Sequence, residues 1–147
     1  MKILFVCTGN TCRSPMAAAL MNKIATENDI DIVADSAGVF TDGSPVSKNA
    51  IRAMREYEID ISSYVSKQVT EDMIENADLV FTMTEGQRVM ITAEKNDKIF
   101  TLGEYSGSNE DIPDPFGGSQ EEYNETADVL YEYVMDAFEK LVEDYNL

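Results

Sequence analysis

Residues 3–15 read ILFVCTGNTCRSP, an apolar run that passes into a small polar loop and then into a helix start. The apolar residues are typical of a buried β-strand. Ser14 is suited to cap the following helix, and Pro15 fits the first helical position because its missing N–H costs nothing there. The loop N–H groups and the positive end of the helix together predict an anion-binding site.

The loop begins with a thiol and ends with a guanidinium. Cys7 stands at the mouth of the expected anion site, where a cysteine should ionise to a thiolate. A thiolate that faces a bound oxyanion indicates covalent phosphoryl transfer. Arg13 is expected to hold two phosphoryl oxygens in a bidentate fork.

The residues within the loop are expected to complete the anion site. Their backbone N–H groups would bind the phosphoryl oxygens and stabilise the charge of the transition state. These groups belong to Thr8, Gly9, Asn10, Thr11, Cys12 and Arg13. We expect Asn10 to adopt a left-handed backbone angle and to tie the loop to its surroundings. The Ser14 hydroxyl is expected to donate to the sulfur of Cys7, to cap the helix, or to do both.

Composition narrows the classes of protein that fit. A chain of 147 residues is expected to form one domain, residues 1–147, and its 44% hydrophobic content is enough for a core. The formal net charge of −17 makes nucleic acids and anionic membranes poor partners. Docking proteins are therefore expected to carry basic patches. A monomer is the favoured state.

Two absences restrict the chemistry. There is no histidine, so the commonest general base and metal ligand is missing. The two cysteines, Cys7 and Cys12, are too few for a four-thiolate zinc site or a disulfide framework. Free thiols and an N-terminal apolar run too short for a signal peptide or a membrane span predict a cytoplasmic protein.

Strand and helix patterns alternate along the chain. Strands are predicted at residues 3–6, 30–34, 79–83 and 98–102, and helices at 15–27, 47–57, 70–74, 84–93 and 119–147. Residues 36–45 and 103–118 are predicted to be loops. Such alternation indicates an α/β fold, a parallel sheet flanked by helices, in which ligands bind beyond the carboxyl ends of the strands. The Cys7 loop leaves the first strand at that end.

Without histidine, the leaving group needs another proton donor. Asp114 lies between Pro113 and Pro115, in the loop after the last predicted strand. Its setting selects it from the 28 acidic residues as the candidate general acid. Phe116, two residues later, is a candidate wall of the same pocket.

Four segments in family order carry a resemblance that spans nearly the whole chain. They are CTGNTCRSPMA at 7–17, SAG at 36–38, ADLVFTMT at 77–84 and DPFGGS at 114–119, and they resemble the low-molecular-weight protein-tyrosine phosphatase family. The resemblance implies a three-layer fold with a four-stranded parallel, flavodoxin-like sheet and a phosphate-binding loop after the first strand.

The same resemblance implies the roles of the site residues. Cys7 is the nucleophile that forms a cysteinyl-phosphate intermediate, Arg13 is the phosphate clamp, and Asp114 is the general acid and then the base for water. The substrates are phosphorylated proteins, and no metal or cofactor takes part. Tyr64 departs from the family, where a histidine is frequent in this region, and it is expected to lie away from the chemistry.

Thr11 bears on which phosphate is removed. Tyrosine phosphatases of the family usually have an aliphatic residue here, whereas a bacterial arginine phosphatase branch resembles this chain in its CTGNTCRSP loop and its DPFGG acid loop. A planar cationic guanidinium fits better beside a hydroxyl than beside an aliphatic side chain. Phosphoarginine is therefore the predicted substrate, and phosphotyrosine is the alternative.

Two functions from other classes fit part of this pattern. An arsenate reductase resembles this loop and fold but needs further cysteines outside the loop. A phosphate-binding module without catalysis would keep Arg13 and dispense with Cys7 and Asp114. A second role is open for Cys12, which either forms a reversible disulfide that protects the Cys7 thiolate from over-oxidation or is a small loop residue that donates its N–H.

Overall fold

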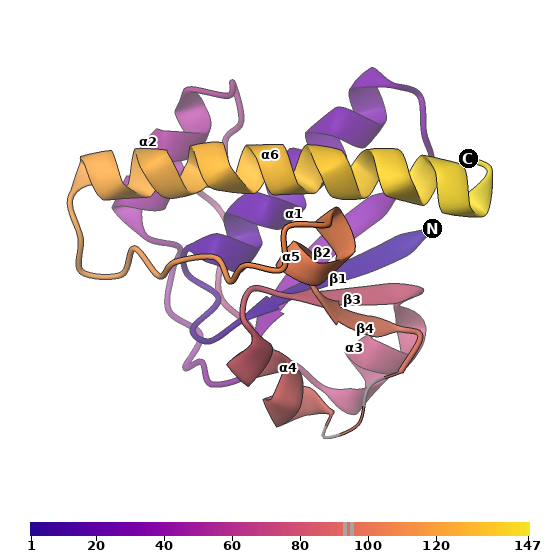
Figure 1. The fold of residues 1–147 in the computed structure, drawn as a ribbon. Helices are drawn as coiled ribbons and strands as arrows, with labels where there is room; N and C mark the ends of the chain where they lie inside the picture. Colours follow the sequence, from indigo (N-terminus) through magenta and orange to yellow (C-terminus); the bar gives the residue numbers. More distant parts are fainter. Residues whose placement is uncertain (93, 95) are drawn as a thin grey trace.

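The computed structural model describes residues 1–92, 94 and 96–147, and it contains a single parallel sheet with helices on both faces (Figure 1). The strands are β1 (Lys2–Cys7), β2 (Val33–Gly38), β3 (Leu79–Thr82) and β4 (Ile99–Thr101). The helices are α1 (Arg13–Glu27), α2 (Lys48–Arg55), α3 (Glu71–Asn76), α4 (Glu85–Ile91), α5 (Leu102–Ser106) and α6 (Gln120–Tyr145).

The strand order is β2-β1-β3-β4, and every pair is parallel, which confirms the predicted α/β sheet. Alternate residues of β1 face opposite layers because side chains alternate along a strand. Ile3 and Phe5 pack into the core formed with α1 and α6, whereas Leu4 and Val6 pack against residues of α3 and α4. The carboxyl end of this central strand therefore emerges between two helical layers, and the Cys7 loop begins there.

The long C-terminal helix packs against α1, α2 and α5, and it lies in front of α1 in Figure 1. The apolar face of α6 is buried over most of its length, for example at Leu130, Val134 and Leu141. Tyr145 lies in the last turn of α6 and is 47% exposed. Ser119 caps the helix by accepting a hydrogen bond from the N–H of Glu122.

The second strand lies at Val33–Gly38, later than predicted. Asp29 adopts a left-handed angle (φ 54°) and Ile30 donates its N–H to the α1 carbonyl of Ala25, so residues 28–32 form the helix exit. On the outer edge of β2, the side-chain amide of Asn22 accepts from the N–H of Ala34 and donates to its C=O. Asp35 and Ser36 lie within this strand, so apolar alternation does not mark it.

The predicted loop at 103–118 is wrong at its start, where α5 (Leu102–Ser106) forms instead. The Thr101 hydroxyl caps this short helix by accepting from the N–H of Glu104, and Gly107 ends it with a left-handed angle (φ 94°). The predicted helix at 84–93 corresponds to α4, and its last residue, Ala93, lies outside the described residues.

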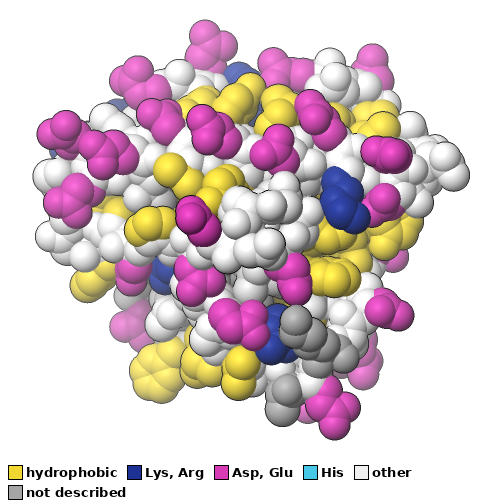
Figure 2. Space-filling view, viewed as in Figure 1, with side chains coloured by type: hydrophobic (Ala, Val, Ile, Leu, Met, Phe, Trp, Pro, Cys, Tyr) yellow, Lys and Arg dark blue, Asp and Glu magenta, His cyan; other side chains and the backbone are white. Residues whose placement is uncertain are grey.

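The surface is strongly acidic. Figure 2 shows Asp and Glu side chains scattered over the face that α6 covers, with few basic side chains among them. In α6 itself, Lys140 accompanies a series of exposed acids. Of the helices in the described part of the chain, none combines the length and the apolar character needed to cross a membrane.

Candidate active site

A pocket of about 230 Å³ opens at the carboxyl end of β1. Its lining brings together Cys7, Thr8, Gly9, Asn10, Thr11, Cys12, Arg13, Asp114 and Phe116. These are the residues that the sequence predicted for the site, except Ser14, which is fully buried behind the loop. The floor of the pocket is buried, with Cys7 and Arg13 at 3% and 5% exposure, whereas Phe116 at the mouth is 76% exposed.

Ser14 contacts the sulfur of Cys7 and does not cap α1. The helix begins at Arg13, and the side chain of its cap residue, Cys12, makes no capping hydrogen bond. The Ser14 Oγ lies 2.9 Å from the Cys7 Sγ. It also accepts a hydrogen bond of 2.7 Å from the Asn10 Nδ2, so its own proton is left for an acceptor. The Cys7 sulfur at 2.9 Å is a much nearer acceptor than the carbonyl oxygen of Ala37 at 3.5 Å. The predicted contact with sulfur is confirmed, and the predicted cap is wrong.

The protonation of Cys7 is set by two opposing effects. Burial raises the pKa of the thiol above its ordinary value, because a charged sulfur is poorly solvated there. The hydrogen bonds from Ser14, the charge of Arg13 and the N–H of Asn10, 3.2 Å from the sulfur, all lower that pKa. Burial is the larger effect, which differs from the resting thiolate expected from the sequence. Every neighbour named here nevertheless favours the charged form.

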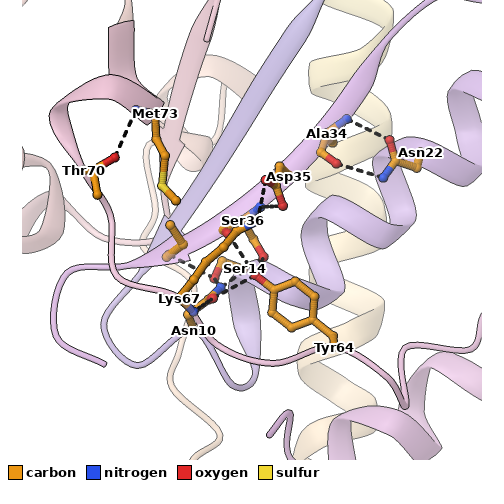
Figure 3. A network of polar contacts seen from close by, with 11 residues as sticks. Asn10, Ser14, Asn22, Ala34, Asp35, Ser36, Tyr64, Lys67, Thr70 and Met73 are labelled. Carbon is orange, nitrogen blue, oxygen red and sulfur yellow. Dashed lines mark hydrogen bonds and ion pairs between the residues drawn. The ribbon is translucent and has the colours of Figure 1, made fainter. Parts of the chain in front are cut away.

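Asn10 is the centre of the polar network drawn in Figure 3. It is fully buried and has the predicted left-handed backbone angle, φ 57°. Its Oδ1 accepts from the backbone N–H of Lys67 at 3.0 Å, which fixes the orientation of the amide because a backbone N–H can only donate. Its Nδ2 then donates to the hydroxyls of Ser14 and Ser36.

Tyr64 closes a ring of hydrogen bonds with Asn10. The Asn10 Nδ2 donates to the Ser36 Oγ (3.0 Å), which donates to the Tyr64 hydroxyl (2.6 Å). The Tyr64 hydroxyl donates back to the Asn10 Oδ1 and also lies within hydrogen-bond distance of the carbonyl oxygen of Ser36, each at 2.8 Å. The sequence placed Tyr64 away from the proposed chemistry, and the structure adds that Tyr64 binds Asn10, the residue that shapes the loop. Burial is the main cause that raises the pKa of Tyr64, so its hydroxyl keeps its proton at neutral pH.

Arg13 joins the phosphate loop to the loop that carries Asp114. Its Nη1 donates to the carbonyl oxygen of Ile112, 99 residues away in sequence, at 2.9 Å. Its Nη2 lies 3.6 Å from the Oδ2 of Asp114, whose side chain is 55% exposed. The other carboxylate oxygen accepts from the N–H of Phe116. The predicted acid and the predicted wall therefore reach the pocket together.

Cys12 lies on the inner side of the loop. Its Sγ is 3.2 Å from the hydroxyl of Tyr123 on α6 and 3.6 Å from the Oγ1 of Thr11. Burial and the contact with Cys12 raise the pKa of Tyr123 to about 12. Both cysteines are free thiols here, so a disulfide between Cys7 and Cys12 stays a prediction.

Sequence reasoning assigned no role at the site to Ser36, Tyr64 or Tyr123. Tyr123 stands at a helical core position, and Ser36 was placed in a loop, so neither gave a separate signal. Within the described residues, no three His, Cys, Asp or Glu side chains converge as a metal site would require.

The chain is similar to known phosphatases over nearly its whole length. The family model for low molecular weight phosphotyrosine protein phosphatase matches residues 2–147. A protein-arginine-phosphatase of Bacillus subtilis is 44% identical, over 98% of this chain and 99% of its own. A tyrosine phosphatase of Staphylococcus haemolyticus, PtpB, is 38% identical over 88% of this chain and 92% of its own.

Solved structures agree with this match. The YwlE arginine phosphatase, solved as a mutant with a phosphorylated active site serine, superposes with a TM-score of 0.93 at 41% identity, covering 99% of both chains. The fold and the site define a cysteine-dependent phosphatase of low molecular weight. The chain belongs to the low molecular weight phosphotyrosine protein phosphatase family.

The contact between Ser14 and Cys7 predicts a measurable pKa effect. Ser14→Ala removes a donor that stabilises the thiolate, so the pKa of Cys7 should rise further, by about one unit or more. The pH dependence of inactivation by iodoacetamide should shift to higher pH by that amount. Ser36→Ala removes a hydroxyl that touches Asn10 and not the sulfur, and it should shift the profile less. Identical profiles for Ser14→Ala and wild type would contradict this role of Ser14.

Proposed function

We propose that this enzyme removes the phosphoryl group from phosphoarginine residues of proteins through a phosphate ester of Cys7. The observation that carries the proposal is the pocket itself. The Cys7 thiol, the Arg13 guanidinium and the Asp114 carboxyl all line this pocket, and Thr11 lines it too. Two relatives named protein-arginine-phosphatase, 44% and 42% identical over nearly the whole chain, support the choice of substrate.

In the first half of the reaction, the Cys7 thiol first loses its proton to solvent, which the hydrogen bond from Ser14 and the charge of Arg13 favour. The resulting thiolate attacks phosphorus, and a sulfur–phosphorus bond forms. The phosphorus–nitrogen bond to the substrate breaks, and Asp114 in its acid form gives its proton to the leaving nitrogen. Arg13 and the loop N–H groups neutralise the phosphoryl oxygens, which carry most of the charge in the transition state. The Ser14 hydroxyl stabilises the thiolate before the attack.

In the second half, water attacks the cysteinyl phosphate. Asp114, now a carboxylate, takes a proton from this water, and the sulfur–phosphorus bond breaks. Inorganic phosphate and the Cys7 thiolate are the products. Ser14 aids this step because its hydrogen bond stabilises the departing thiolate. Protons and charges therefore balance over the cycle with the groups of this pocket and one water molecule.

Thr11 supports a guanidinium substrate for a physical reason. A guanidinium is planar and charged, and it presents N–H donors that a hydroxyl oxygen can accept. An aliphatic side chain at this position would leave those N–H donors without a partner when the guanidinium is buried in the pocket. Leaving such groups unpaired is costly, so one hydroxyl can change the preference of the site.

A second candidate substrate is phosphotyrosine. Phe116 lies at the mouth of the pocket and is 76% exposed, so it presents an aromatic face against which a phenyl ring can pack. A relative named as a tyrosine phosphatase, 38% identical, is consistent with this candidate. The same two-step chemistry applies, with oxygen as the leaving atom.

The surroundings of the reaction are also proposed. The net charge of −17 favours substrate proteins that carry basic patches near the phosphorylated residue. Because both cysteines are free thiols, we place the enzyme in a reducing compartment, the cytoplasm, where it acts as a monomeric single domain without a metal or cofactor.

Substrate preference tests the proposal. The wild type should hydrolyse a phosphoarginine peptide with a higher kcat/KM than the matched phosphotyrosine peptide. Thr11→Ile should reverse this order because it replaces the hydroxyl with a larger apolar side chain. Thr11→Ser keeps the hydroxyl and should keep the wild-type order. A wild type that prefers phosphotyrosine under matched conditions would contradict arginine specificity.

Asp114 should matter most when the leaving group needs a proton. Asp114→Asn should lower kcat/KM for a phosphoarginine peptide by about 10²–10⁴-fold. The loss should be smaller for p-nitrophenyl phosphate, because nitrophenolate leaves as a stable anion and kcat/KM reports only the first half-reaction. Asp111→Asn, an exposed acid of the same loop, is the matched control and should change neither value. Equal losses on both substrates would show that Asp114 is not the acid.

A further inference from the structure

Gln87, in the first turn of α4, is a buried amide whose orientation is fixed. Its side chain accepts hydrogen bonds at Oε1 from the backbone N–H groups of Met83 and Thr84, both at 3.0 Å. Backbone N–H groups can only donate, so the other end of the amide is the NH₂ group. This Nε2 lies 3.0 Å from the Oγ1 of Thr8 in the phosphate loop. The Thr8 hydroxyl is therefore the acceptor in this contact.

Thr8 stands at the mouth of the pocket. Of the residues that line the pocket, Thr8, Asp114 and Phe116 are exposed, whereas Cys7 and Arg13 form the buried floor. The floor carries the groups that bind a phosphoryl group. The mouth must then hold the part of the substrate to which the phosphoryl group is attached, so Thr8 faces the leaving group.

The backbone of Thr8 is held independently of Gln87. Its carbonyl oxygen accepts from the N–H of Phe40 at 3.0 Å, and a Cβ added at Gly38 would come within 2.7 Å of the same oxygen. The main chain is thus fixed from the β2 side. What Gln87 adds is the direction of the hydroxyl: with one lone pair engaged by Nε2, Oγ1 keeps a second lone pair for another N–H donor.

We propose that Gln87 is a positioning residue for substrate specificity, which holds Thr8 so that its hydroxyl accepts an N–H of the guanidinium of phosphoarginine. The inference rests on the proposed function and adds a second hydroxyl to that of Thr11. A guanidinium offers several N–H donors beyond the phosphorylated nitrogen, whereas the phenyl ring of phosphotyrosine offers none. The contact therefore favours arginine over tyrosine.

The experiment measures the ratio of kcat/KM for matched phosphoarginine and phosphotyrosine peptides. Thr8→Val removes the hydroxyl at nearly constant shape and should lower the ratio about fivefold or more, as loss of one hydrogen bond does. Gln87→Leu should lower it in the same direction. In the double variant, Gln87→Leu should add nothing to Thr8→Val, because the amide acts through that hydroxyl.

Thr84→Val is the matched control for damage to α4. The Thr84 hydroxyl caps this helix by accepting from the N–H of Gln87, so its loss weakens the same helix start. The contact between Gln87 and Thr8 remains in this variant. The ratio should therefore stay at the wild-type value, while the melting temperature falls as it does for Gln87→Leu.

The outcomes separate the inference from the function on which it rests. An unchanged ratio in Thr8→Val, or a further fall when Gln87→Leu is added to it, overturns the role of Gln87 and leaves arginine specificity intact. A wild-type preference for phosphotyrosine overturns the proposed function itself. A lower ratio in both single variants, with no additional loss in the double variant and no change in Thr84→Val, supports the inference.

Discussion

The hydrogen bonds of the Asn10 side chain hold the phosphate loop in its shape. A non-glycine residue in the left-handed region is uncommon, and a buried amide is costly unless its donors and acceptors are paired. Here the ring through Ser36 and Tyr64, together with the N–H of Lys67, supplies those partners. The same amide donates to Ser14 and so directs that hydroxyl to the sulfur of Cys7. Backbone shape and nucleophile therefore depend on one side chain.

A second constraint joins the phosphate loop to the acid loop. Arg13 is the first residue of α1, and its side chain is buried in the floor of the pocket. There its guanidinium donates to the carbonyl of Ile112 and faces Asp114. A charged group at this depth requires such partners. One residue thus binds the anion and positions the segment that supplies the proton. The parallel sheet makes this possible because β1 and β4 end at the same edge.

Much of the site could be predicted because its residues are close in sequence and chemically distinctive. Cys7, Arg13 and the helix start lie in one short loop, and Asp114 is marked by its flanking prolines. The contributions of Tyr64 and Gln87 come from distant segments. Tyr64 stands out in the sequence only as a departure from the family, and nothing in the local pattern of Gln87 separates it from an ordinary polar position. The strand β2 begins later than predicted because residues 28–32 form the exit of α1, and Ser14 does not cap α1 because the helix already begins at Arg13.

The mechanism requires that phosphate passes through the sulfur of Cys7, and rapid quenching tests this step itself. The wild-type enzyme would be mixed with a phosphoarginine peptide, stopped in denaturant within milliseconds and analysed by peptide mass spectrometry. A phosphoryl group on the peptide that contains Cys7, present early and lost as free phosphate accumulates, is the expected result. Full turnover with no phosphorylated cysteine at any time, or phosphate on another residue, would contradict the mechanism.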